Sequence, residues 1–206
     1  MNRKKSSKQW LDEHFSDPYV QQAKDDGYRG RAAYKLDELD KKYGLFKTGM
    51  TVVDLGAAPG AWSQVVVKRL HGSGQVIASD ILDMEPIHGV MFVQGDFRDD
   101  DILRELQREM GSKKADLVIS DMAPNMSGMA SIDQPASYYL AELAVDLCHR
   151  VLKPEGTFLV KVFQGQGFDE YMALLRNSFS HVTVCKPKAS RPRSKEVYAL
   201  ARGFNL

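Results

Sequence analysis

The stretch Thr51–Ser63, TVVDLGAAPGAWS, decides the fold of this chain. Its first part, Thr51–Leu55, is a short aliphatic and β-branched run of the kind that forms a buried strand. Gly56 and Gly60 follow and enclose residues 57–59, whose small or constrained side chains leave the backbone open to a ligand. The stretch therefore predicts a buried strand, a glycine-rich turn that binds a ligand at close range, and the start of a helix.

The spacing of the glycines discriminates between nucleotide ligands. A dinucleotide-binding turn has the pattern G-x-G-x-x-G, in which the second glycine lets the backbone approach a pyrophosphate. Ala58 occupies that position here. The sequence therefore disfavours a nicotinamide-dependent dehydrogenase, and its Asp-x-Gly-x-x-x-Gly spacing fits a different nucleoside ligand.

Aspartates recur at the carboxyl ends of four predicted strands. They are Asp54, Asp80, Asp96 and Asp121, at the ends of strands expected over residues 51–55, 75–79, 90–94 and 115–120. Because ligands of α/β folds bind outside the carboxyl ends of parallel strands, these side chains should surround one crevice. Asp80 follows the glycine turn by about twenty residues, where a carboxylate accepts hydrogen bonds from ribose hydroxyls.

The rest of the pattern predicts a single α/β domain over residues 31–206. Further helices are expected at 32–43, 62–70, 99–110, 135–151 and 168–179, and further strands at 157–163, 181–185 and 196–200. Residues 1–30 should form a basic arm and a short helical segment, in which Pro18 suits a helix start. Residues 126–134 are expected to form a flexible loop that could cover a substrate, with a helix opening at Pro135.

Lys161 stands in the middle of an apolar strand, FLVKVF, at residues 158–163. A buried amine loses hydration unless a carboxylate or a catalytic task compensates. We therefore interpret Lys161 as a functional residue.

A basic segment that is interrupted by prolines and contains no acids, KPKASRPRSK, spans residues 186–195, although the net charge of the chain is only +1. This segment predicts an exposed arm that binds phosphates.

With Pro59 and Trp62 included, the turn DLGAAPGAW resembles motif I of the class I methyltransferases, and more narrowly the FtsJ family of ribosomal-RNA ribose 2′-O-methyltransferases. The similarity continues from HFSDPYVQQAK through APNMSG and KVFQGQGFDEY to SRPRSKEVY. It implies a Rossmann-like, mostly parallel seven-stranded sheet with helices on both faces, and S-adenosylmethionine as the cofactor. The implied cofactor contacts are Asp54, Gly56, Gly60, Trp62, Asp80, Asp96, Phe97 and Asp121. Of these, Asp96 and Phe97 would contact the adenine.

Lys35, Asp121, Lys161 and Glu196 occur in the order of the lysine-aspartate-lysine-glutamate tetrad of FtsJ-type and mRNA-cap ribose 2′-O-methyltransferases. A ribose hydroxyl is a poor nucleophile, whereas a methyl sulfonium is already activated. The enzyme must therefore align an in-line displacement and manage one proton. The resemblance implies that the two carboxylates orient the two amines, and we expect Lys161 to be the proton acceptor.

The family's usual substrate is a uridine in the A loop of 23S rRNA within the large ribosomal subunit, which implies a role in ribosome biogenesis. The predicted RNA-binding residues are Arg29, Arg31, Lys186, Lys188, Arg191, Arg193 and Lys195. Transfer RNA or an mRNA cap remains an alternative acceptor, because the tetrad is common to those enzymes. A noncatalytic RNA-binding or ribosome-assembly factor remains an alternative of a different class.

Base-methylating enzymes fit the sequence less well. Enzymes that modify exocyclic nitrogens carry Asp/Asn-Pro-Pro-aromatic at the fourth strand, whereas Asn125 follows Pro124 here. Cytosine C5 enzymes attack through a cysteine, but Cys148 lies in an apolar helical stripe and Cys185 follows a valine.

Two distant cysteines are also too few for a metal knuckle, so no metal is expected. Without an apolar run of membrane-spanning length or a signal peptide, we expect a soluble, cytoplasmic monomer.

Overall fold

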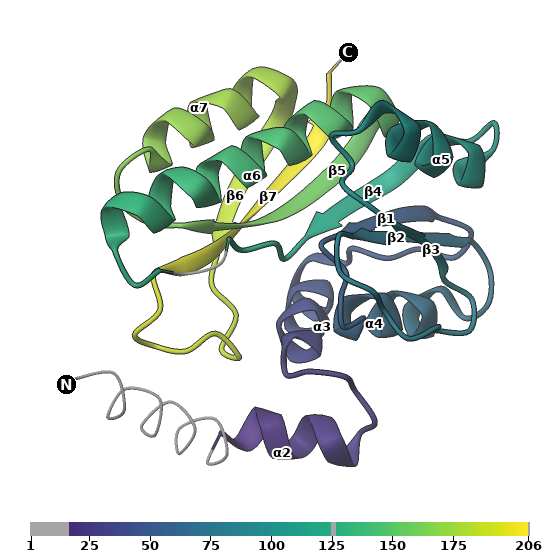
Figure 1. The fold of residues 1–206 in the computed structure, drawn as a ribbon, viewed down its shortest axis with the longest axis horizontal. Helices are drawn as coiled ribbons and strands as arrows, with labels where there is room; N and C mark the ends of the chain where they lie inside the picture. The colour runs from purple at the N-terminus through teal and green to yellow at the C-terminus, as the bar shows by residue number, and fades with distance from the viewer. Residues whose placement is uncertain (1–16, 125–126, 206) are drawn as a thin grey trace.

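The computed structural model describes residues 17–124 and 127–205 (Figure 1). Its helices are α2 (Pro18–Asp25), α3 (Ala32–Tyr43), α4 (Ala61–Leu70), α5 (Asp100–Met110), α6 (Ala130–Val151) and α7 (Phe168–Ser178). Its strands are β1 (Thr51–Leu55), β2 (Gln75–Asp80), β3 (Met91–Gln94), β4 (Ala115–Ser120), β5 (Leu152–Phe163), β6 (Phe179–Cys185) and β7 (Glu196–Phe204). Each strand predicted from the sequence is present, as is each helix predicted from residue 32 onward.

The strands form one seven-stranded sheet in the order β3-β2-β1-β4-β5-β7-β6. The strands from β3 to β5 pair in parallel, whereas β7 is antiparallel to both β5 and β6. The predicted α/β sheet is therefore confirmed, and the reversed strand β7 makes it mixed. The reversal has a consequence for the site. Glu196, the first residue of β7, lies opposite Phe163, the last residue of β5, and so reaches the edge at which the parallel strands end.

Helices cover both faces of the sheet, with α3 and α4 on one face and α5, α6 and α7 on the other (Figure 1). The period of two along a strand explains this arrangement, because successive side chains point to opposite faces. Val52 packs with the α3 and α4 cluster, and Val53 packs with the α5, α6 and α7 cluster. Both cores extend from β1 to β7, so the strand ends that form the crevice are supported from both sides.

Helix α6 begins at Ala130, earlier than the predicted start at Pro135, so Pro135 lies inside the helix. Asp133 accounts for the earlier start, because its carboxylate accepts hydrogen bonds from the Ser127 N–H at 2.7 Å and the Gly128 N–H at 3.0 Å. These bonds tie the preceding loop to the first turns of the helix, although a proline at this depth removes one helical hydrogen bond. The predicted loop over residues 126–134 is therefore wrong from Ala130 onward, and Met126 lies outside the described residues.

Strands β5 and β7 are longer than predicted. β5 begins at Leu152, which pairs with Ala115 before a register shift in the ladder, and Glu155 within this first part of the strand has φ 63°. β7 continues to Phe204, which pairs with Phe179 of β6. Pairing with both neighbours extends β7 beyond the residues whose apolar pattern marked it as a strand.

Helix α2 begins at Pro18, as predicted. Asp17 caps it, because its carboxylate accepts a hydrogen bond from the Tyr19 N–H at 3.0 Å. The basic residues expected in an N-terminal arm lie among residues 1–16, outside the described residues. Within the described part of the chain, no helix combines the length and the apolar character that crossing a membrane requires.

Candidate active site

Asp54 is buried at the carboxyl end of β1, beneath the glycine turn. Its Oδ2 accepts a hydrogen bond from the Ser63 hydroxyl of α4 at 2.7 Å. Burial raises the pKa of the Asp54 carboxyl to about 7, against the lowering effect of the Ser63 bond, and the nearby Asp121 and Asp80 carboxylates add to the rise. Asp54 therefore joins β1 to α4, and its contact with a cofactor stays a prediction.

The two glycines of the turn are required by its geometry. Both have left-handed backbone angles, with φ 70° at Gly56 and 107° at Gly60. A Cβ at Gly56 would lie 2.2 Å from Cγ of Met122, and a Cβ at Gly60 would lie 2.6 Å from Cδ1 of Ile87. The turn is thus packed closely between the residue that follows Asp121 and the loop that follows β2.

Asp80 ends β2 and braces the glycine turn. Its Oδ2 accepts a hydrogen bond from the Ala58 N–H, and its Oδ1 accepts one from the Leu82 N–H, both at 2.9 Å. The adjoining Ile81 and Leu82 are 67% and 63% exposed and form an apolar rim beside this carboxylate. A carboxylate has about four lone-pair sites, so Asp80 retains acceptor capacity for ribose hydroxyls.

Asp96 is already paired, which the sequence did not indicate. Arg98 donates to both of its carboxylate oxygens, including a bond from Nε to Oδ2 of 2.8 Å, and the hydrogen bonds from Arg98 lower the pKa of Asp96. Arg98 also approaches the Tyr139 hydroxyl of α6 at 3.4 Å. Phe97 is partly buried against the core. A purine amino group would therefore have to share Asp96 with Arg98, and the adenine roles of Asp96 and Phe97 stay predictions.

Trp62 lies in the core and not on the surface of the crevice. It is 3% exposed, and its indole N–H donates to the Ala32 carbonyl at 2.8 Å. Its ring lies 5.7 Å from the ring of Tyr198. The side chain therefore fixes the start of α3 against α4 and β7. The contact between Trp62 and a cofactor stays a prediction, and with the side chain buried it would be made by the backbone. An amphipathic residue beside a glycine turn suits either a ligand contact or core packing, so the sequence alone did not show that the Trp62 side chain is buried.

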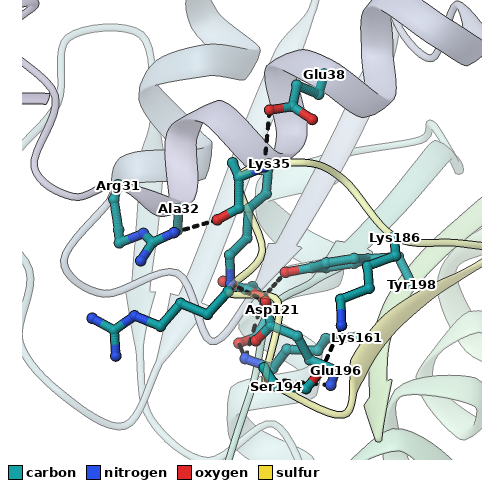
Figure 2. A network of polar contacts seen from close by, with 12 residues as sticks. Arg31, Ala32, Lys35, Glu38, Asp121, Lys161, Lys186, Ser194, Glu196 and Tyr198 are labelled. Carbon is teal, nitrogen blue, oxygen red and sulfur yellow. Dashed lines mark hydrogen bonds and ion pairs between the residues drawn. The ribbon is translucent and has the colours of Figure 1, made fainter. Parts of the chain in front are cut away.

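The structure brings Lys35, Asp121, Lys161 and Glu196 together at the carboxyl edge of the sheet (Figure 2). Lys35 Nζ lies 2.6 Å from Glu196 Oε1, and both side chains are 12% exposed. Lys161 is 8% exposed, lies 3.2 Å from Asp121 Oδ1, and donates to the Asp121 carbonyl at 2.6 Å. The four residues come from α3, β5 and β7 and from the residue after β4, so the fold and not the local sequence assembles them.

Tyr198 belongs to the same cluster, although sequence reasoning missed it. Its hydroxyl donates to Asp121 Oδ1 at 2.7 Å, and its ring lies 6.0 Å from Lys35 Nζ (Figure 2). It pairs with Lys161 across the β5 and β7 ladder. Burial, followed by the Asp121 and Glu196 carboxylates, raises the pKa of Tyr198 well above its usual value. The hydroxyl therefore stays protonated and donates. A tyrosine two residues after Glu196, on the same face of the strand, was the available signal.

Glu196 is held as a carboxylate. Burial alone would raise the pKa of its carboxyl, but the Lys35 ammonium, with smaller contributions from the Ser190 hydroxyl and Lys161, outweighs burial and lowers it.

Cys148 and Cys185 are both buried, and burial raises the pKa of each thiol, so neither is presented as a nucleophile. Residues 17–124 and 127–205 contain no group of three or more histidine, cysteine or acidic side chains that could hold a metal ion.

Arg29 was predicted to bind RNA, but its guanidinium is occupied within the protein. Nη1 donates to the carbonyls of Pro59 at 3.0 Å and Glu85 at 2.6 Å, and Nη2 donates to the carbonyl of Pro86 at 3.0 Å. These bonds join the glycine turn to the loop after β2. Arg29 therefore supports the turn, and its role in RNA binding stays a prediction.

Residues 186–195, here called the strap, connect β6 to β7 and reach from the sheet toward α2 and α3 (Figure 1). Arg31 donates to the Ala189 carbonyl and pairs with Asp17, and Arg191 lies 3.7 Å from the same Asp17 carboxylate. Lys186 donates to carbonyls within the strap. These three basic residues make contacts within the protein, and their predicted role in RNA binding stays a prediction. The exposed basic residues of the strap are Lys186, Lys188, Arg193 and Lys195.

Comparison with known proteins agrees with this geometry. The model of the FtsJ-like methyltransferase family matches residues 28–204. The ribosomal RNA large subunit methyltransferase E of Chromohalobacter salexigens is 58% identical over 201 residues, which cover 98% of this chain and 96% of that protein. A crystal structure described as a ribosomal RNA methyltransferase from Plasmodium falciparum is 31% identical, with a TM-score of 0.77, and covers 86% of this chain and 98% of that chain.

A more distant solved structure shares only the fold. Human methyltransferase-like protein 13, in complex with SAH, is 14% identical with a TM-score of 0.57, over 83% of this chain and 79% of that chain. The match of the family model over most of the chain and the high identity to the bacterial relative are decisive. This chain belongs to the FtsJ-like methyltransferase family.

Proposed function

We propose that this protein transfers a methyl group from S-adenosylmethionine to the ribose 2′-oxygen of a uridine in the A loop of 23S rRNA, within the large ribosomal subunit, as a step of ribosome biogenesis. The observation that carries the proposal is the buried cluster in which Lys35 faces Glu196 and Lys161 faces Asp121. The name of the Chromohalobacter relative, which specifies large-subunit ribosomal RNA, supports the substrate class. We place the protein in the cytoplasm and expect it to act as a monomer.

The crevice fits S-adenosylmethionine better than a phosphate-bearing cofactor. The cofactor carries a sulfonium, an amino group, a ribose and an adenine, and it lacks phosphates. Carboxylates surround the crevice at the ends of β1, β2 and β4, close enough that Asp121 and Asp80 contribute to the raised pKa of Asp54. Such a site attracts a cation and repels a pyrophosphate. Asp80 would hold the ribose of the cofactor. Asp121 and the glycine turn would hold its methionine part, and Asp96 and Phe97 would hold its adenine.

The bound cofactor supplies an activated methyl group, and the protein must position the ribose hydroxyl and remove one proton. Lys161 is assigned as the acceptor of the proton that leaves the 2′-hydroxyl as the new oxygen–carbon bond forms and the sulfur–methyl bond breaks, which releases S-adenosylhomocysteine. Asp121, which is fixed by Tyr198, orients the Lys161 amine. Glu196 holds Lys35 beside this group and limits the repulsion between the two amines. Burial of the cluster excludes water from the proton transfer.

Lys161→Ala tests the chemical role. The variant should lose at least about 100-fold in the rate of methyl transfer, because it lacks the proton acceptor. Its affinity for S-adenosylhomocysteine, measured by calorimetry, should stay unchanged, since Lys161 is assigned to the acceptor side. Lys113→Ala, at an exposed position before β4, is the control and should retain both properties. Turnover at the normal rate in Lys161→Ala would contradict the mechanism.

The substrate is tested by comparing acceptors. The described residues form one sheet with its helices, without a separate RNA-binding domain among them, so we expect recognition to depend on the structured particle. Large subunits isolated from cells that lack the protein should accept methyl groups better than free 23S rRNA or transfer RNA. Preferential methylation of transfer RNA would retain the chemistry and reject the proposed substrate.

A further inference from the structure

The strap is attached to α3 by a contact that is separate from the catalytic cluster. Glu38 lies one helical turn after Lys35. Its Oε2 accepts a hydrogen bond from the Lys188 N–H at 2.6 Å, and its Oε1 accepts one from the Ala189 N–H at 3.0 Å. A carboxylate that accepts two consecutive backbone N–H groups fixes both the position and the orientation of that piece of chain.

Neighbouring contacts reinforce this attachment. Arg31, at the start of α3, donates to the Ala189 carbonyl, so Ala189 is held through both its N–H and its C=O. Its side chain is fully buried in a small cluster with Ala23 and Tyr34. Asp17 joins Arg31 to Arg191. Residues 188–191 are therefore fixed on the surface formed by α2 and α3, while the Lys188 side chain is exposed.

The other end of the strap has its own attachment. Lys186 Nζ donates to the carbonyls of Ser194 at 2.5 Å and Pro192 at 3.3 Å, and the Gln164 N–H donates to the Lys195 carbonyl at 2.9 Å. Glu196 follows directly, in the ladder opposite Phe163. The backbone of Glu196 is therefore held by β5 and by the base of the strap, whereas its carboxylate pairs with Lys35 and is approached by Ser190.

We propose that Glu38 is a positioning residue for RNA binding, which holds residues 188–189 of the strap in place and so presents Lys188 to a phosphate of the RNA. This inference rests on the proposed function. A proline-broken loop without attachment must be ordered when its ligand binds, and that entropy cost weakens binding. Pre-ordering by Glu38 removes the cost before the RNA arrives. Because Glu196 is also held by its place in the ladder with β5 and by its pairing with Lys35, the main effect of Glu38 belongs to substrate binding and not to the chemical step.

Steady-state kinetics with large ribosomal subunits test this division. Glu38→Ala should raise KM about tenfold, which corresponds to about 1.4 kcal/mol, with kcat within about twofold of the wild type. Glu38→Gln keeps one accepting oxygen and should give a smaller rise. Glu105→Ala, an exposed glutamate on α5, is the matched control and should change neither parameter. A lower kcat at unchanged KM would overturn the inference, as would no change at all.

A double-mutant cycle tests whether Glu38 acts through Lys188. Lys188→Ala should also raise KM, but its effect should be smaller in the Glu38→Ala background, because a loose strap no longer presents the lysine. Full additivity of the two effects would overturn the inference.

Limited trypsin digestion without RNA tests the same contact independently of the substrate. Lys186 and Arg191 precede proline and resist trypsin, whereas the bond after Lys188 can be cut. Glu38→Ala should be cut there faster than the wild type and than Glu105→Ala, at similar thermal stability. Equal cutting rates would refute the positioning role. If wild-type protein methylates no RNA but the cutting rates differ as expected, the proposed function fails and the structural attachment stands.

Discussion

Tyr198 contacts both halves of the cluster formed by Lys35, Asp121, Lys161 and Glu196, since its hydroxyl donates to Asp121 while its ring lies beside Lys35. Tyr198→Phe keeps the buried ring and removes only the hydrogen bond to a charged acceptor. The rate of methyl transfer in single-turnover experiments should fall about tenfold, in line with the loss of one charge-assisted bond. The affinity for S-adenosylhomocysteine should not change. An unchanged rate would show that Asp121 is oriented without Tyr198.

Asp54 gives the fold a specific dependence on pH. Its pKa is raised to about 7 in the folded protein from an ordinary value of 3.8, so the folded state retains a proton that the unfolded state loses over this range. The free energy of unfolding should therefore fall as the pH rises from about 4 to about 7. Between pH 5 and pH 8 the contribution of Asp54 to the free energy of unfolding should fall by roughly 2.6 kcal/mol.

Asp54→Asn tests this origin, because asparagine stays neutral and can still accept the Ser63 hydrogen bond. Urea unfolding at several pH values should show a flatter dependence in the variant than in the wild type. Parallel curves for the two proteins would assign the pH dependence to other groups.

At the level of residues, the sequence indicates chemistry where a residue type contradicts its surroundings. Lys161 could be predicted because an amine within an apolar strand requires a reason. Tyr198 could not, because a tyrosine in an apolar strand is also an ordinary core residue, and its Asp121 partner is 77 positions away. Trp62 shows the same ambiguity, since its motif position fits both a ligand contact and the core packing of its side chain that the structure shows.

Among the connecting segments, Arg29 links the glycine turn to the loop after β2 through three carbonyls. Arg29→Ala should weaken binding of S-adenosylhomocysteine several-fold and lower the free energy of unfolding by about 1–3 kcal/mol, because those carbonyls lose their donor. The salt dependence of RNA binding should stay the same as in the wild type.

Lys195→Ala is the contrasting variant for Arg29. It should keep the cofactor affinity and reduce the steepness with which RNA binding falls as salt rises, because a phosphate contact is lost. A reduced salt dependence in Arg29→Ala, with cofactor affinity intact, would support a role of Arg29 in RNA binding.

At the level of elements, the sequence predicted which segments are helices and strands better than what the loops contact. The strap was recognisable as a basic, proline-broken connection, but its attachments to Glu38 and Arg31 join residues 150 to 158 positions apart. Local pattern carries no information on such contacts. The early start of α6 escaped prediction because Asp133 stabilises it through a loop, against the usual preference of proline for a helix start.

For the whole molecule, the reversed strand β7 is the feature that completes the candidate site. A seventh strand parallel to the others would begin at the opposite edge of the sheet, far from Asp121 and Lys161. The antiparallel pairing with β5 instead brings Glu196 to the edge where Lys35 approaches on α3. The order of the tetrad along the chain could be read from the sequence by resemblance, whereas its meeting in space depends on this topology.

The most direct test of the proposed activity is transfer of labelled methyl groups from S-adenosylmethionine to large ribosomal subunits isolated from cells that lack this protein, with the product mapped by nucleoside analysis. We predict a single 2′-O-methyluridine in the A loop of 23S rRNA with the wild type and none with Lys161→Ala. A methyl group on a base, or transfer only to other RNAs while the subunits stay unmodified, would contradict the account.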